Sequence, residues 1–382
     1  MTHDRAIRCG NRGRAMSGIA GTVPETVAHP PAKGARPPMN RTTPPRPVDI
    51  AALFPELARL ARTTTRLHPR PGSPTWHDSS IGGPLLWPAD EPWPTCAGEH
   101  HFPDPPRALA DVRSRREILT AAWRRNRPGT DLLTPREKAL LEQGDAGHPP
   151  GREPNAMLPV AQLYARDIPA LRRPEGTDLL QVLWCPLTHS DGLPAVHLVW
   201  RAVADVEGVT TDPPVPADVD HYGSYVPEPC LVHPEAVTEY PAPHELDEDL
   251  ARRVHAWNDR DHPAAPQGGP NAGRRDVDYQ FDLSVAPGWK VGGWGPWSFS
   301  DAWPMVCEAC AAPMDPLLTV ASDEWDGGNR SWIPAEDRDR PADAPSYRAA
   351  SQPTMVSIGR GDHMQIYICS ASFDHPIHQN MQ

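Results

Sequence analysis

Cysteine and histidine side chains offer the clearest chemistry in this sequence. Cys307 and Cys310 form a C-x-x-C knuckle, a spacing typical of half of a structural zinc site. Structural zinc takes four thiolate or imidazole donors in a tetrahedron, so two further ligands must come from elsewhere in the chain. Cys369 ends a later apolar segment, and His375 follows it closely. We therefore predict a structural zinc site formed by Cys307, Cys310, Cys369 and His375.

A second, weaker set of donors precedes this one along the chain. Cys96 is followed by His100 and His101, either of which could be a ligand, and Cys185 is followed by His189. The second candidate metal site is thus Cys96, His100, Cys185 and His189. For both sets, the alternative is that the thiols are buried packing residues and that the histidines lie on the surface.

No motif indicates a particular reaction. The sequence contains no P-loop, dinucleotide-binding fingerprint, Gly-x-Ser-x-Gly elbow or His-Glu-x-x-His pattern. A redox role for Cys307 and Cys310 is disfavoured, because no thioredoxin-like βαβ pattern surrounds them. The acidic segment 323–329 could bind a cation, but its Asp, Asn and Gly residues are also those that an exposed turn requires.

Composition limits the compartment and the partners. Seven cysteines spread over 382 residues favour free thiols or metal ligands in a reducing compartment over a disulfide framework. No segment approaches the roughly 20 apolar residues of a membrane span, and residues 1–25 lack a secretory apolar core. We expect a cytoplasmic protein without membrane association. The net charge of −12 disfavours nucleic acid and suits a basic or neutral-polar partner.

Two stretches of the chain repeat one pattern of glycine, tryptophan and proline. Residues 81–94 read IGGPLLWPADEPWP, and residues 291–304 read VGGWGPWSFSDAWP. The Gly-Gly pair, two tryptophans and the final proline align without a gap, and Cys96 and Cys307 follow one residue out of step. Glycine tolerates positive φ and a close approach of other groups, so the Gly-Gly pair predicts a tight turn.

Two further blocks recur in the same order, which predicts a tandem of related modules. Residues 159–163 resemble 317–321 in character, and residues 180–185 align with 364–369 without a gap. The first module then contains an insertion at 108–144, which the second module lacks. Its periodicity and a capping box at Thr134 predict helix, and its arginines favour a solvated helix face over an RNA contact.

The repeated tryptophans allow two interpretations. Large aromatic residues are most often packed in or near the core. Alternatively, they form an aromatic platform that binds a partner peptide or ligand. The residues concerned are Trp87, Trp93, Trp297 and Trp303.

The elements that must position these residues are short. Apolar runs at 179–184, 195–203, 316–321 and 364–369, bounded by Gly and Pro, predict strands. Amphipathic helix is expected from residue 49 and over 244–257. We predict an α+β fold of two related half-domains with short, mainly antiparallel strands, a few flanking helices and long Pro/Gly-rich loops.

The predicted domain boundaries follow from composition and from the repeat. Residues 1–47, rich in Pro, Arg and Gly, are expected to be a disordered tail. Residues 48–205 form the first half-domain, 206–275 the connection and 276–382 the second half-domain with the knuckle.

The repeated motifs resemble those of the YwqG-like family, a bacterial domain of unknown function. The similarity lies in Gly-Gly, Trp-Pro-x-Cys, Val-Ala-Gln-Leu and Leu-Gln-Val-Leu-Trp-Cys, within about residues 50–382. It implies a mixed α/β fold and protein binding, including immunity-type neutralisation of toxins. The second module is also similar to programmed-cell-death-two type ribosomal-protein chaperones, although it has fewer cysteines than they do.

These observations favour a protein-binding scaffold, chaperone-like or immunity-like, with a polypeptide partner and structural zinc. The alternative is a metal-dependent enzyme that uses Cys96, His100, Cys185 and His189 as an open site. The two hypotheses differ in the effect of removing a ligand, which would cost stability in the scaffold and activity in the enzyme.

Overall fold

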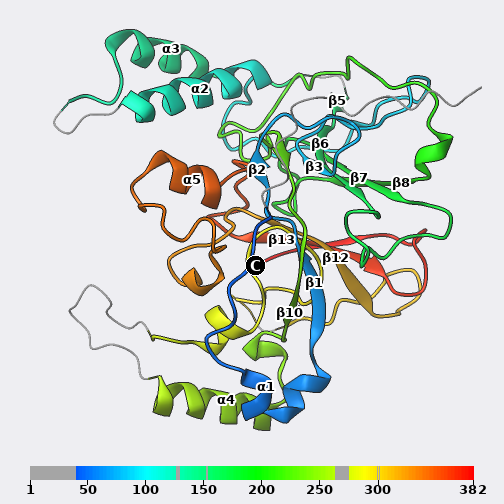
Figure 1. Ribbon diagram of the computed structural model, residues 1–382. Coiled ribbons are helices and arrows are strands. Elements are labelled where there is room, and N and C mark those ends of the chain that lie inside the picture. The colour runs from blue at the N-terminus through cyan, green and yellow to red at the C-terminus, as the bar shows by residue number, and fades with distance from the viewer. Residues whose placement is uncertain (1–39, 126–129, 152–153, 263–274, 299, 301) are drawn as a thin grey trace, which may run out of the picture. The chain divides into compact units, whose positions relative to one another are not determined.

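A computed structural model of the chain describes residues 40–125, 130–151, 154–262, 275–298, 300 and 302–382. They belong to one compact unit that spans Met39–Gln382. Every strand pair in it is antiparallel, and helices lie outside the sheets (Figure 1). The predicted α+β class with mainly antiparallel strands is confirmed.

Two six-stranded sheets form the centre of this unit. The first runs in the order β10 (Glu235–Glu239), β1 (Arg62–Arg66), β11 (Lys290–Gly292), β12 (Met314–Ala321), β13 (His363–Cys369), β14 (His378–Met381). The second runs in the order β2 (Arg70–Pro71), β9 (Cys230–Leu231), β3 (Ser80–Ile81), β6 (Leu158–Tyr164), β7 (Leu179–Trp184), β8 (Val196–Arg201). A small hairpin joins β4 (Thr95–Cys96) to β5 (Asn155–Ala156).

One hydrophobic core is shared by the two sheets. It includes Val160, Val182 and Trp184 from the second sheet together with Leu318 and Ile366 from the first, all of them almost fully buried. Residues on central strands alternate between the two faces of a sheet, so each sheet contributes one apolar face to this core. The four runs predicted as strands all contain strands, because their apolar residues supply this shared face.

Four strands of each sheet repeat the same order and register. In the second sheet Ile81 pairs with Ala161, and Ala161 with Val182. The first sheet matches this arrangement, since β11 pairs with β12 through Val291↔Leu318, and β12 pairs with β13 through Leu318↔Ile366. The register shifts at the same place in both, after Pro159 and after Pro316. Ala161 therefore corresponds to Leu318 in the structure, whereas the comparison of 159–163 with 317–321 placed it opposite Thr319. The structural correspondence puts the bulge directly after a proline in both copies.

The sheets do not follow the predicted half-domain boundaries. Strand β1, from the predicted first half-domain, pairs with β11 in the sheet that contains the second module. The predicted connection 206–275 contributes β9 to one sheet and β10 to the other. Its prolines and acidic residues suggested a linker, but Cys230–Leu231 lies between β2 and β3 in the second sheet, and Glu235–Glu239 forms an edge strand of the first sheet.

Five α-helices are present in the described part of the chain: α1 (Ile50–Leu53), α2 (Leu109–Arg125), α3 (Pro135–Asp145), α4 (Glu248–Asp261) and α5 (Pro345–Ser351). The insertion contains α2 and α3, and α3 begins with the predicted capping box, in which Thr134 and Glu137 bond each other's backbone. Helix α4 starts later than predicted, because Asp247 caps it by accepting from the Leu250 N–H. Among the described residues, no helix is long and apolar enough to cross a membrane.

The predicted disordered tail covers residues 1–47, of which 1–39 lie outside the described residues. Residues 40–47 are ordered, contrary to the prediction, because their side chains and backbone form ion pairs and hydrogen bonds with charged residues of the fold. Arg41 forms an ion pair with Asp337, and the Thr43 N–H donates to the Glu235 carboxylate at 2.9 Å. Residues 40–47 therefore pack onto the fold, contrary to what their proline content indicated.

Candidate metal centres

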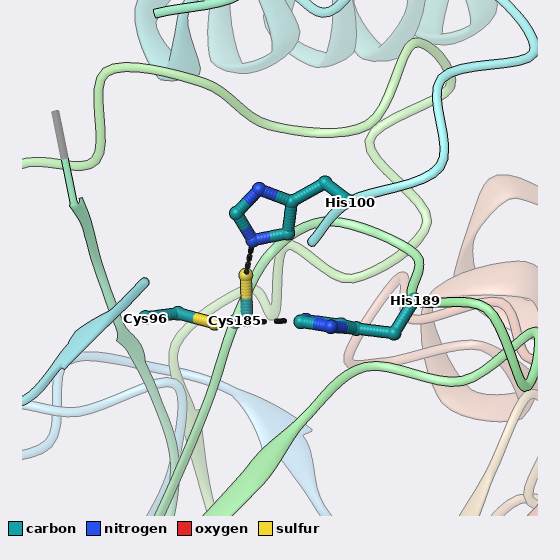
Figure 2. Close-up of side chains that lie close together, drawn as sticks. All are labelled: Cys96, His100, Cys185 and His189. Atoms are coloured by element: carbon teal, nitrogen blue, oxygen red, sulfur yellow. Dashed lines mark hydrogen bonds between the residues drawn. The ribbon is translucent and has the colours of Figure 1, made fainter. Parts of the chain in front are cut away.

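The structure brings together all four residues of the weaker predicted set. Cys96 ends β4, Cys185 directly follows β7, His100 lies in the loop after β4, and His189 lies in the loop before β8. One ligand atom of each residue lies within 4.8 Å of the others. Figure 2 shows the two imidazoles pointing toward the sulfurs, with Cys185 Sγ 3.3 Å from His100 Nε2 and Cys96 Sγ 3.6 Å from His189 Nε2.

The sequence left His100 and His101 open as the histidine of this site, and the geometry selects His100. The His101 backbone N–H instead donates to the Thr188 carbonyl, and its side chain borders a separate small cavity. The cluster is closely packed, since a Cβ on Gly98 would lie 3.2 Å from the His189 ring and 3.7 Å from Cys96 Sγ. We call Cys96, His100, Cys185 and His189 the first cluster.

The stronger predicted set also converges. Cys307 and Cys310 lie on a tight loop that closes through a Cys307 N–H to Ala312 carbonyl hydrogen bond of 2.9 Å. Cys369 is the last residue of β13, and His375 lies in the turn that leads to β14. Here too, one ligand atom of each residue lies within 4.8 Å of the others. We call Cys307, Cys310, Cys369 and His375 the second cluster.

Contacts within the second cluster are as short as those in the first. Cys310 Sγ lies 3.5 Å from Cys369 Sγ, and His375 Nδ1 lies 3.4 Å from Cys369 Sγ and 3.5 Å from Cys307 Sγ. The contact atom of His375 is Nδ1, whereas His100 and His189 use Nε2. The two clusters therefore differ in the number of sulfurs and in the imidazole nitrogen that faces them.

The two clusters occupy equivalent places in the repeated strands. Cys185 and Cys369 both stand at the end of the third repeated strand, and Cys96 and Cys307 both stand on the preceding short hairpin. In the second module this hairpin closes through a single Val306↔Pro313 bridge. In the first module Thr95 pairs with Ala156, so the insertion with α2 and α3 lies inside the knuckle loop itself.

Burial and hydrogen bonds give the two equivalent cysteines different acidities. Burial raises the pKa of Cys185 to about 12, and the nearby Cys96 thiol adds to this effect. Burial also opposes ionisation of Cys369, but the Ala371 N–H, which donates to its sulfur at 3.3 Å, and His375 together lower its pKa to about 6. Burial lowers the pKa of both His100 and His189, which favours the neutral imidazole that a metal ion requires.

Sequence reasoning missed the methionines that cover each cluster. Met157 packs with Cys96 and Cys185, and Met314 packs with Cys307 and Cys369. Each methionine donates its N–H to the strand that carries the first cysteine, at Pro94 and Met305 respectively. The repeated Met-x-Pro sequence at 157–159 and 314–316 was the available signal, but the insertion separates it from Cys96 in the first module.

The four repeated tryptophans do not form a shared aromatic platform. Trp87 is 1 % exposed and Trp297 is 4 % exposed. Trp93 is half-buried, lies 5.1 Å from the Trp87 ring centroid, and donates from Nε1 to the Met157 carbonyl. Trp303, its counterpart, is 72 % exposed. Three of the four are therefore packing residues, and only Trp303 is available to a partner.

The remaining cysteines stand apart from both clusters. Cys230 is buried in β9 and donates from its sulfur to the Pro353 carbonyl, and Cys9 lies outside the described residues. Arg116 of the insertion serves the fold, since it donates to the Val226, Gly223 and Met355 carbonyls and pairs with Glu228.

No protein-family model matches the chain, and a search of curated proteins gave no significant match. The resemblances to the YwqG-like family and to the chaperone family therefore stay predictions. Each of the two Cys/His clusters in the described residues could hold a metal ion.

Proposed function

We propose that this protein is a protein-binding scaffold in which each Cys/His cluster holds one structural Zn²⁺. The observation that carries the proposal is the convergence of four thiolate or imidazole donors at each of two equivalent places. Zinc bonds of about 2.3 Å to sulfur and about 2.0–2.1 Å to nitrogen give tetrahedron edges of about 3.8 Å between sulfurs and about 3.6 Å between sulfur and nitrogen. The five contacts described above, at 3.3–3.6 Å, fit these edges, and every other pair of donor atoms within a cluster lies within 4.8 Å.

The donor count favours a structural role for the ions. Structural zinc has four protein ligands, whereas catalytic zinc keeps one position for water or substrate. Both clusters offer four, and each joins a knuckle loop to the end of a central strand. Zinc binding there would stabilise both knuckle loops. Without it, the first loop is closed by the two residue pairs between β4 and β5, and the second by the single Val306↔Pro313 bridge.

Metal content of the purified protein tests this part of the proposal. Protein prepared without chelator should contain about two equivalents of zinc by elemental mass spectrometry. Cys307→Ser and Cys96→Ser should each retain about one equivalent, because each removes a ligand from one cluster only. Cys230→Ser is the matched control and should retain both, since Cys230 belongs to neither cluster. Zinc-free protein that is fully folded would contradict the proposal.

Protein binding is supported by the exposed apolar segment beside the second cluster. Trp303 is 72 % exposed and Val306 is 51 % exposed, and Pro304 between them is exposed as well. Tryptophan that is open to solvent is costly to leave uncovered and is enriched at protein interfaces. The acidic net charge suits a partner that adds basic or neutral-polar groups around an apolar anchor.

Substitution of Trp303 tests whether this exposed segment binds a partner protein. A basic or neutral-polar protein that co-purifies with the wild-type chain should bind Trp303→Ala at least about tenfold more weakly, the range of a moderate interface hot spot. Leu53→Ala, at another exposed apolar residue, should bind as the wild type does. Equal binding by both variants would exclude this segment as the binding surface.

A metal-dependent enzyme at the first cluster is the second candidate, and one observation supports it. A cavity of about 140 Å³ is lined in part by His101, Thr188 and Asp220. Its lining includes the sequence neighbours of two cluster residues, because His101 follows His100 and Thr188 precedes His189. Its polar groups are already engaged, however, because Asp220 accepts from the Tyr222 and Tyr225 N–H groups. This arrangement favours the scaffold over the enzyme, and His100→Ala separates the two by costing stability in one case and turnover in the other.

A further inference from the structure

The second cluster contains a sulfur that solvent can reach. Cys310 is exposed, whereas the other five described cysteines are buried. The first cluster has no equivalent sulfur, because its two cysteines are buried and its outer donors are His100 and His189. Oxidants in solution therefore meet the second cluster at Cys310, while a thiol of the first cluster requires prior opening of the fold.

A partner sulfur stands ready beside Cys310. Cys369 Sγ lies 3.5 Å from Cys310 Sγ, so disulfide formation needs the two atoms to approach by about 1.5 Å to the usual length of about 2.05 Å. The knuckle loop that carries Cys310 is closed by the Val306↔Pro313 bridge and by the Ala311 N–H, which donates to the Cys307 carbonyl at 2.8 Å; neither restraint involves the Cys310 backbone, so the Cys310 side chain can make this movement.

We propose that Cys310 and Cys369 are a peroxide-oxidisable pair, whose disulfide dismantles the second metal centre and leaves the first intact. The Cys310 thiolate attacks one oxygen of hydrogen peroxide, the O–O bond breaks, and Cys310 becomes a sulfenic acid as hydroxide leaves. The Cys369 thiolate then displaces the second hydroxide from that sulfur and forms the S–S bond. Two protons convert both hydroxides to water, so two thiolates are oxidised and one peroxide is reduced.

Cys369 is the resolving residue because of its position. Its Sγ lies 3.5 Å from Cys310 Sγ, whereas the Cys307 thiol, which also interacts with Cys310, has His375 Nδ1 as a second neighbour at 3.5 Å. The Ala371 N–H donates to Cys369 Sγ and holds it toward the loop. A disulfide removes two of the four ligands at once, and the remaining Cys307 and His375 are too few for a structural zinc site.

The consequence for the metal rests on the proposed zinc binding, but the disulfide itself does not. Metal-loaded protein is treated with a small excess of hydrogen peroxide in the presence of a chromogenic zinc chelator. We expect about one of two equivalents to be released, a Cys310–Cys369 linkage in the peptide map, and recovery of zinc binding after reduction with dithiothreitol.

Cys310→His is the matched variant, because it gives the second cluster the two-cysteine, two-histidine donor set of the first. It should bind two equivalents and release none with peroxide. Release of both ions from the wild type, a Cys307–Cys310 linkage, or no linkage at all would overturn the inference. Protein that lacks zinc but still forms the Cys310–Cys369 disulfide would remove the proposed metal function and leave the oxidation site established.

Discussion

The two modules place their donor atoms on equivalent strands but surround them differently. In the first module the knuckle loop contains an insertion, and the outer donors are half-buried histidines. In the second module the loop is a few residues long, and an exposed cysteine and an exposed tryptophan lie beside it. The repeated strands therefore set the position of each cluster, and the knuckle loop sets the solvent exposure of its donor residues.

Ligand removal should give the largest loss of stability in both modules. A free zinc concentration a thousandfold above Kd stabilises a folded protein by about 4 kcal/mol, so Cys185→Ser and Cys369→Ser should each lower the free energy of unfolding by about that amount. Cys185→Ser should additionally loosen the insertion, because His100 lies in the loop that leads from β4 to α2. Hydrogen exchange in α2 measures this, and faster exchange there in Cys369→Ser instead would contradict the comparison.

The Gly-Gly turns allow a sharper test within the second module. A Cβ on Gly293 would lie 1.9 Å from Glu239 Oε1, which is held by the fully buried Lys290. Gly293→Ala should therefore cost about 3–5 kcal/mol by disturbing this buried pair. Gly292, with φ +71° but no atom nearer than 3.9 Å, is the matched control. Gly292→Ala should cost about 1–2 kcal/mol through its backbone conformation alone. Urea denaturation measures the free energy of unfolding of both variants. Equal losses would show that the Lys290–Glu239 pair moves aside without a loss of stability.

The equivalent tryptophans should respond unequally to truncation. Trp93 packs against Trp87 and bonds the Met157 carbonyl, so Trp93→Ala should lower the free energy of unfolding by about 2–3 kcal/mol. Trp303→Ala should change it by less than about 0.5 kcal/mol, because the side chain is mostly exposed. Thermal unfolding of both variants measures the difference, and a large loss in Trp303→Ala would indicate a structural role.

The smallest expected effect lies in the insertion, which only the first module contains. Thr134→Ala removes the capping box of α3 and should destabilise this exposed helix by about 1 kcal/mol. Amide exchange should quicken in α3 and stay unchanged in α4, which has its own cap at Asp247. Loss of zinc from the first cluster in this variant would show that α3 and the cluster are coupled.

Much of the fold could be read from local pattern. The runs at 179–184 and 364–369 are strands because buried strands need continuous apolar residues, and Gly82, Gly83, Gly292 and Gly293 all have positive φ, as expected of tight turns. The strand pairing of β1 with β11 could not be read in this way, because Arg62–Arg66 is rich in threonine and arginine and its partner lies more than two hundred residues away.

The grouping of the donors follows from the sequence alone, because duplication placed a cysteine at the end of each third repeated strand and on each knuckle. Tertiary structure decided the choice of His100 over His101, the one-residue shift at the prolines, and the exposure of Cys310 and Trp303. These outcomes depend on loop paths and on packing between distant segments, which local residue patterns do not encode.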